Sequence, residues 1–165
     1  MRFISFKISN FRGIQEAKID LLPQGAGIST LIGLNESGKT TVLEAISTFQ
    51  RYGGDEKSLY QSEPSQIDAT SFVPKHEKAT FTGAITVAAE VEFEGPDRAH
   101  CIAYVKKESD VKIDPSSIPD RIIITRGYRF ENGDEVETIN DWSVNVMGVA
   151  KGKRKSSPLP KDEPA

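Results

Sequence analysis

Residues 33–40 read Gly-Leu-Asn-Glu-Ser-Gly-Lys-Thr, and no other run in the sequence restricts the fold as strongly. Its spacing, a glycine and four residues before Gly-Lys-Thr, is typical of a phosphate-binding P-loop. Gly33 and Gly38 would let the backbone turn tightly and bring its N–H groups against phosphate oxygens. The run therefore predicts a strand before the loop, a helix after it, and ATP or a related triphosphate held between them.

Several side chains of the run have a predicted role in that site. Lys39 would reach the β and γ oxygens, and the helix that starts near it would direct its positive end at the same phosphates. The hydroxyl of Thr40 would ligate Mg²⁺, a cation that prefers oxygen ligands. We expect Thr41 to contact the α-phosphate. The cofactors predicted are thus ATP and Mg²⁺, and the remaining loop residues assigned to the site are Asn35, Glu36 and Ser37.

The spacing of apolar residues around the loop fits an arrangement of strand, loop and helix. Residues 4–8 and 17–21 alternate between apolar and polar, which predicts two strands with one buried face each. The mostly apolar residues 28–32 predict a strand buried on both faces. From Lys39 onward the apolar residues follow the stripe of an amphipathic helix, which Gly53-Gly54 should end. That stripe consists of Val42, Leu43, Ile46 and Phe49.

The rest of the chain predicts a mostly antiparallel meander. Asn132-Gly133 is a strong hairpin signal, residues 95–97 should form a turn, and Trp142 is expected to be a core anchor. The proline-containing residues 55–78 should be a long loop or a short irregular helix, and residues 110–120 should be a loop. The expected strands cover residues 85–93, 100–106, 121–130, 135–139 and 142–149.

These patterns together predict an α/β (α+β-like) fold: a P-loop NTPase lobe with an antiparallel meander and one strong helix. We expect one domain over residues 1–149. Residues 150–165 are basic and rich in proline, which predicts a disordered tail or linker.

Composition limits the partners and the compartment. The net charge is −3, so any contact with DNA should be local and not spread over the whole surface. Cys101 is the single cysteine, which excludes an internal disulfide and favours a reducing compartment. The sequence contains neither a signal peptide nor a run of 18 apolar residues. We therefore expect a cytoplasmic location and no membrane association.

Two segments resemble one family of ATPases. Residues 6–14, which include Asn-Phe-Arg-Gly, and residues 31–46, Leu-Ile-Gly-Leu-Asn-Glu-Ser-Gly-Lys-Thr-Thr-Val-Leu-Glu-Ala-Ile, look like the start of an ABC-type ATPase of the SMC, RecF and OLD (overcoming lysogenisation defect) group of AAA family ATPases. The resemblance covers about the first 50 residues. Glu36 and the meander look most like the OLD branch.

The resemblance implies further roles. Asn35 would lie beside the γ-phosphate, and Arg12, with Asn10, would sit where the first turn approaches the nucleotide. A complete member would form a head-to-head dimer around ATP, with DNA as a possible partner, in repair, recombination or phage defence.

The chain also departs from the family pattern. A Walker B segment and the serine-glycine signature loop are missing, and Gln61 and Gln66 are candidates for the Q-loop glutamine. We therefore expect an N-terminal lobe that binds ATP, hydrolyses little by itself, and needs a C-terminal lobe in cis or in trans.

Three other classes of protein make different demands on the same residues. A small GTPase would need Asp-x-x-Gly and Asn-Lys-x-Asp, which do not occur. A small P-loop kinase would need an arginine-bearing lid, for which Arg121, Arg126 and Arg129 are the clustered candidates. A stand-alone nucleotide-binding module that never hydrolyses ATP stays open beside the leading hypothesis.

Overall fold

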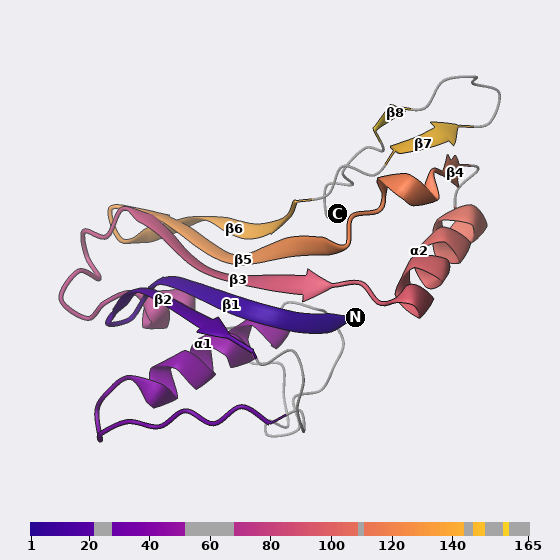
Figure 1. Cartoon of the computed structure of the whole chain (residues 1–165). Helices are drawn as coiled ribbons and strands as arrows, with labels where there is room; N and C mark the ends of the chain where they lie inside the picture. Colours follow the sequence, from indigo (N-terminus) through magenta and orange to yellow (C-terminus); the bar gives the residue numbers. More distant parts are fainter. Residues whose placement is uncertain (22–27, 52–67, 109–110, 144–146, 151–156, 159–165) are drawn as a thin grey trace, which may run out of the picture. The chain divides into compact units, whose positions relative to one another are not determined.

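The computed structural model describes residues 1–21, 28–51, 68–108, 111–143, 147–150 and 157–158. These residues cluster into two compact units, and Figure 1 labels their helices and strands. The P-loop unit contains Ile4–Ala89 and Ile124–Asp141, and the α2 unit contains Met1–Phe3, Glu90–Ile123 and the described residues from Trp142 onward.

The main sheet has five strands: β1 (Arg2–Phe11), β2 (Ile14–Asp20), β3 (Gly83–Glu92), β5 (Arg121–Glu131) and β6 (Asp134–Trp142). Their order across the sheet is β2-β1-β3-β5-β6. β1 and β2 pair antiparallel, with Phe6 opposite Ile19. β5 and β6 are joined by two residues, a connection that requires an antiparallel hairpin. The strands predicted at residues 4–8, 17–21, 85–93, 121–130 and 135–139 are confirmed.

The burial of β3 explains why the alternation of apolar and polar residues predicts this strand correctly. Its alternate residues on one face are buried, and they are Ile85, Val87, Ala89 and Val91. On the other face, Arg121 of β5 pairs with Glu90 at 3.3 Å and with Glu92 at 3.2 Å. Arg2 of β1 also pairs with Glu92. The hydrogen bond from Arg2 is the largest cause that lowers the pKa of the Glu92 carboxyl below its usual value, and the bond from Arg121 lowers it further.

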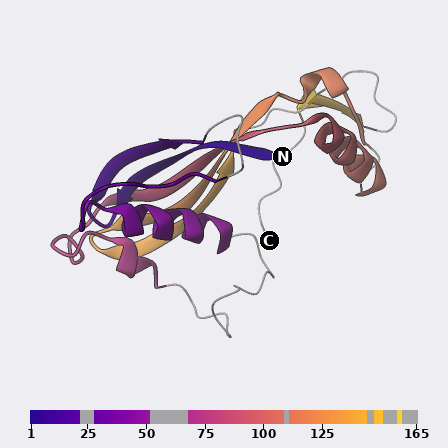
Figure 2. The same ribbon diagram turned by 60° about the horizontal axis from the view of Figure 1, so that its bottom comes forward.

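Helix α1 (Lys39–Arg51) covers one face of the sheet within the P-loop unit (Figure 2). Ala45, Thr48 and Phe49 form its buried side. The ring of Phe49 packs edge-on against Phe6 of β1, with centroids 5.6 Å apart. The hydroxyl of Thr48 donates to the Ala45 carbonyl at 2.7 Å, so this buried polar group is satisfied. The predicted helix is therefore confirmed.

Of the apolar stripe predicted for α1, Phe49 is buried and Val42 and Ile46 are partly buried. The assignment of Leu43 to that stripe is wrong, because its side chain is 58% exposed. The predicted end of the helix at residues 53–54 lies outside the described residues.

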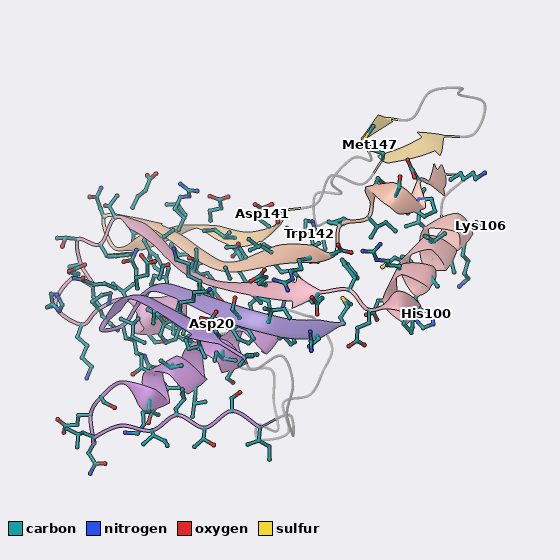
Figure 3. All side chains as sticks on the ribbon, in the orientation of Figure 1. Asp20, His100, Lys106, Asp141, Trp142 and Met147 are labelled. Atoms are coloured by element: carbon teal, nitrogen blue, oxygen red, sulfur yellow. The ribbon has the colours of Figure 1, made fainter. Side chains whose placement is uncertain are left out.

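The hairpin between β5 and β6 turns at Asn132 and Gly133, as predicted. Both residues have positive φ, 50° and 87°, as a tight hairpin turn requires. β6 lies at the edge of the sheet, and its residues are exposed except for the partly buried Ile139. Trp142, labelled at the end of β6 in Figure 3, is 45% exposed. The prediction of a core anchor is wrong, because the last residue of an edge strand has few neighbours to cover it.

The strand predicted at residues 28–32 is wrong. These residues form no regular structure, and Ile28 and Ile32 are 79% and 92% exposed. A strand forms only through hydrogen bonds to a neighbouring strand, and residues 28–32 are not among the strands of the described sheet. An apolar segment therefore lies on the surface directly before the P-loop.

The turn predicted at residues 95–97 and the strand predicted at 100–106 are also wrong. Both lie within helix α2 (Gly95–Glu108). Pro96 stands in the first turn, where its missing N–H costs nothing. Asp97 lies in the first turn, and its carboxylate accepts the N–H of Glu94 just before the helix at 2.9 Å, as the acidic residue of a capping box does. These start signals outweigh the strand preference of the apolar residues that follow.

A second, small antiparallel sheet lies in the α2 unit. Its strands β4 (Val111–Ile113), β7 (Met147–Ala150) and β8 (Ser157–Pro158) pair in the order β4-β7-β8. The loop predicted at residues 110–120 thus contains a strand and the short 3-10 helix η2 (Pro115–Ser117). The predicted strand 142–149 is replaced by the end of β6 and by β7. Of the predicted tail, Ala150 and residues 157–158 lie in strands, and the rest falls outside the described residues.

Candidate nucleotide-binding site

The loop of residues 33–38 has the backbone that its two glycines predict. Gly38 has a φ of +85°, a conformation that favours glycine. A Cβ added to Gly33 would lie 2.8 Å from the hydroxyl oxygen of Ser37, so glycine allows the two sides of the loop to approach. Glu36 also has a positive φ, 64°, at the tip of the turn. Ser37 N–H donates to the Leu34 carbonyl across this turn at 3.3 Å.

Lys39 lies at the first position of α1 and folds back over the loop. Its ammonium donates to the carbonyl of Gly33 at 2.7 Å, to the carbonyl of Leu34 at 2.5 Å and to the hydroxyl of Ser37 at 3.3 Å. A cation thus stands in the concave side of the loop. The serine contact is the longest of the three, and it is the contact that a phosphate oxygen would most readily replace.

The start of α1 supplies the other groups that an anion needs. Val42 N–H already donates to the Gly38 carbonyl at 3.0 Å, which leaves the N–H groups before it without a partner inside the helix. These groups and the helix dipole favour negative charge at this end. Asn35 and Thr40 are exposed beside it, and Thr41 is partly buried. The donor set fits a magnesium–polyphosphate: a hydroxyl oxygen at Thr40 for the ion, and amides with Lys39 for the phosphates.

The sheet holds α1 at its far end through Arg126 of β5. The guanidinium of Arg126 donates to the Phe49 carbonyl at 2.6 Å and lies over the Phe49 ring, 4.8 Å from its centroid. A cation at a helix C-terminus is favourable because the unpaired carbonyls there carry partial negative charge. Arg126, weighed as a lid residue of a kinase, instead fixes the P-loop helix on the sheet.

The structure also places Asn10 and Arg12. The side-chain amide of Asn10 donates to the Ala84 carbonyl at 2.9 Å and so ties β1 to β3. The guanidinium of Arg12 pairs with Glu44 of α1, and its Nε donates to the Ser71 carbonyl at 3.3 Å. The contact of Asn10 and Arg12 with a nucleotide stays a prediction.

Ser71 belongs to η1 (Ala69–Phe72), a short 3-10 helix that Asp68 caps. The carboxylate of Asp68 accepts the Thr70 hydroxyl at 2.7 Å and the Thr70 N–H at 3.0 Å. The hydroxyl bond, more than any other contact, holds the pKa of the Asp68 carboxyl below its usual value. An ionised cap thus keeps η1 formed beside Arg12.

Sequence reasoning did not find Glu44 as part of this region. Its partner Arg12 is 32 residues away, and no local pattern reveals a pair over that separation. A signal is visible only after the fold is known, since Glu44 lies one turn beyond Thr40 on the same helix.

A glycine loop closed over a lysine at the start of a sheet-packed helix defines a P-loop nucleotide-binding domain. The family model of the AAA ATPase domain matches residues 1–150, and the chain belongs to this family. None of the helices in the described part of the chain has the length and hydrophobicity that crossing a bilayer requires.

Two curated relatives carry the description "DNA replication and repair protein RecF". The protein of Erwinia tasmaniensis (strain DSM 17950 / CFBP 7177 / CIP 109463 / NCPPB 4357 / Et1/99) is 31% identical over 134 residues, which cover 76% of this chain and 33% of the relative. That of Edwardsiella ictaluri (strain 93-146) is 42% identical over 66 residues, 40% of this chain and 17% of the relative. The resemblance to the SMC, RecF and OLD group is therefore confirmed, and the chain spans a third or less of these relatives.

Proposed function

We propose that this chain is the ATP- and Mg²⁺-binding N-terminal lobe of an SMC/RecF/OLD-like ATPase that acts in DNA transactions such as repair, recombination or phage defence. The observation that carries the proposal is the loop of residues 33–38 closed by Lys39 at the start of α1. The printed function of the RecF relatives supports the DNA-related part.

In this proposal the loop amides and the first N–H groups of α1 hold the phosphates. Lys39 neutralises the β and γ oxygens, and Thr40 ligates Mg²⁺ with water molecules that complete its shell. Asn35 is placed beside the γ-phosphate, and Thr41 beside the α-phosphate. When Mg²⁺ is bound, it offsets the negative charge of the triphosphate. The groups of the protein orient the three phosphates.

The lobe is proposed to need a second lobe for hydrolysis, in cis or in trans. The sequence has no run of four apolar residues followed by Asp-Glu, so the carboxylates that would complete the magnesium shell and activate water are missing. The exposed apolar residues before the helix support the same proposal, since a strand from another lobe would pair with residues 28–32 and cover them. The exposed large residues here are Ile28, Ile32 and Leu34.

In the assembled ATPase, two such heads would close around ATP, head to head, and this closure would gate the contact with DNA. The stand-alone binding module differs from this proposal in one measurable respect, because it predicts no hydrolysis in any context. ATP turnover measured with and without the neighbouring C-terminal segment separates the two.

Calorimetric titration of the full chain with Mg²⁺–ATP tests the binding site. Replacing Lys39 by Ala should weaken binding by about tenfold to a hundredfold, the loss expected for a charged hydrogen bond to phosphate. Lys18→Ala is the matched control, because Lys18 is an exposed lysine of β2 that pairs with Asp20 at 2.8 Å. Equal affinity of the Lys39 variant and the control, or no binding by the wild type, would reject the proposal.

A further inference from the structure

Arg12 occupies an unusual backbone position. It lies in the turn between β1 and β2 with a φ of 53°, a left-handed conformation in which a Cβ crowds the following carbonyl. Gly13 follows directly, yet the positive φ falls on the arginine. A residue whose backbone is held in a sparsely populated conformation points to a constraint imposed by its contacts.

Those contacts join three elements of the P-loop unit. The backbone N–H of Arg12 donates to the Phe72 carbonyl at 2.6 Å, and its Nε donates to the Ser71 carbonyl at 3.3 Å, both on η1. Its Nη1 pairs with the Glu44 carboxylate on α1. Beneath the turn, Phe11 stacks on Phe72 with centroids 4.9 Å apart, which fixes the turn on η1. The guanidinium is therefore aimed at α1 from a rigid base.

The pair meets α1 in the first half of the helix, one turn beyond Thr40. A force on the Glu44 carboxylate therefore acts within this half. Arg126 holds the C-terminal end at a distance of 2.6 Å. Two arginines thus hold α1, one near its middle through Glu44 and one in its last turn through the Phe49 carbonyl. Since the N–H groups at the helix start point along its axis, the tilt of α1 decides where they meet an anion.

We propose that Arg12 is a positioning residue of the nucleotide site: through Glu44 it fixes the tilt of α1, and thereby directs the N–H groups at the helix start toward the phosphates. This inference rests on the proposed nucleotide binding. In this role Arg12 acts through the helix, and the ligand is a polyphosphate nucleotide with Mg²⁺.

A double-mutant cycle on the full chain tests this role. Glu44→Gln and Arg12→Gln should each weaken Mg²⁺–ATP binding by about two- to fivefold, the range of a half-exposed ion pair. Mg²⁺–ADP should lose the same factor, the double variant should bind no worse than either single variant, and Arg12→Lys should restore part of the affinity. Glu137→Gln is the matched control, because Glu137 pairs with Arg129 at 2.8 Å on the β5–β6 hairpin, and it should leave affinity unchanged.

Two results of the binding measurements would overturn the role. One is wild-type affinity in Glu44→Gln. The other is an Arg12→Gln loss that is larger for ATP than for ADP while Glu44→Gln binds as well as or better than wild type, which would mean that the guanidinium contacts the γ-phosphate directly.

Amide hydrogen exchange without nucleotide separates this inference from the proposed function. Both single variants should speed exchange at Val42, whose N–H bonds to the Gly38 carbonyl in the first turn of α1. Urea unfolding of each variant shows whether it stays folded. If the wild type does not bind Mg²⁺–ATP, the proposed function fails, and unchanged exchange at Val42 would overturn the positioning role by itself.

Discussion

Replacing Gly127 by alanine should be among the most damaging single-methyl changes in the chain. Gly127 lies on β5, and a Cβ built on it would be 2.0 Å from the Ile85 carbonyl oxygen and 2.9 Å from the Thr86 Cα. A carbon and a carbonyl oxygen normally stay about 3.3 Å apart. Both neighbouring atoms belong to the backbone of β3, so no side-chain rotation relieves the overlap, and the adjacent strands β3 and β5 must separate.

We expect Gly127→Ala to lower the free energy of unfolding by about 3 kcal/mol, the upper end for overpacking in a core. This corresponds to a fall of roughly 10 °C in the melting temperature. Urea and thermal unfolding, followed by circular dichroism, measure both quantities. Gly13→Ala is the control, since nothing lies within 4 Å of a Cβ there, and it should stay within about 0.5 kcal/mol of wild type. A Gly127 variant as stable as this control would refute the reasoning.

Three further predictions concern the P-loop, the helix that follows it and the charged face of the sheet. Gly38→Ala should cost about 1 kcal/mol of stability because its φ is +85°, and it should weaken Mg²⁺–ATP binding in calorimetry; unchanged affinity would contradict the loop geometry. Phe49→Ala should cost about 3–5 kcal/mol in urea unfolding, since the ring is 4% exposed and packs on Phe6; a loss below about 1 kcal/mol would show that α1 does not depend on this contact. The pKa of Glu92 is lower in the folded chain than in the unfolded one, so its stabilising contribution is present above the unfolded pKa and is lost as the pH falls through the folded pKa. Urea midpoints of Glu92→Gln should therefore fall less than those of wild type between about pH 6 and pH 3, and parallel curves would argue against the pair with Arg2.

Local sequence chemistry was enough for the P-loop, α1 and the β5–β6 hairpin. The residues that decide each of these features are neighbours in the chain: the two glycines around the loop, the apolar stripe from Val42 to Phe49, and Asn132-Gly133. Helix α2 also has local start signals. Gly95-Pro96-Asp97 favours a helix start and a turn alike, so the sequence alone predicts a turn there.

The failures come from partners that the local sequence does not contain. Residues 28–32 have the composition of a buried strand, yet a strand forms only where another strand accepts its hydrogen bonds. The ion pair of Arg12 with Glu44, and the bond of Arg126 to the Phe49 carbonyl, join residues 32 and 77 positions apart. The candidate site was therefore predictable as a loop, whereas the contacts that orient its helix were not.

The position of β6 at the edge of the described sheet has an electrostatic consequence. Its nine residues carry the carboxylates of Asp134, Glu135, Glu137 and Asp141 and no basic side chain. Carboxylates along an exposed edge discourage an incoming strand from another molecule. They also repel a polyanion over roughly one Debye length, about 8 Å at physiological salt. A nucleic acid near β6 would therefore meet net negative charge along this edge of the sheet, which the Arg129–Glu137 pair at 2.8 Å partly offsets.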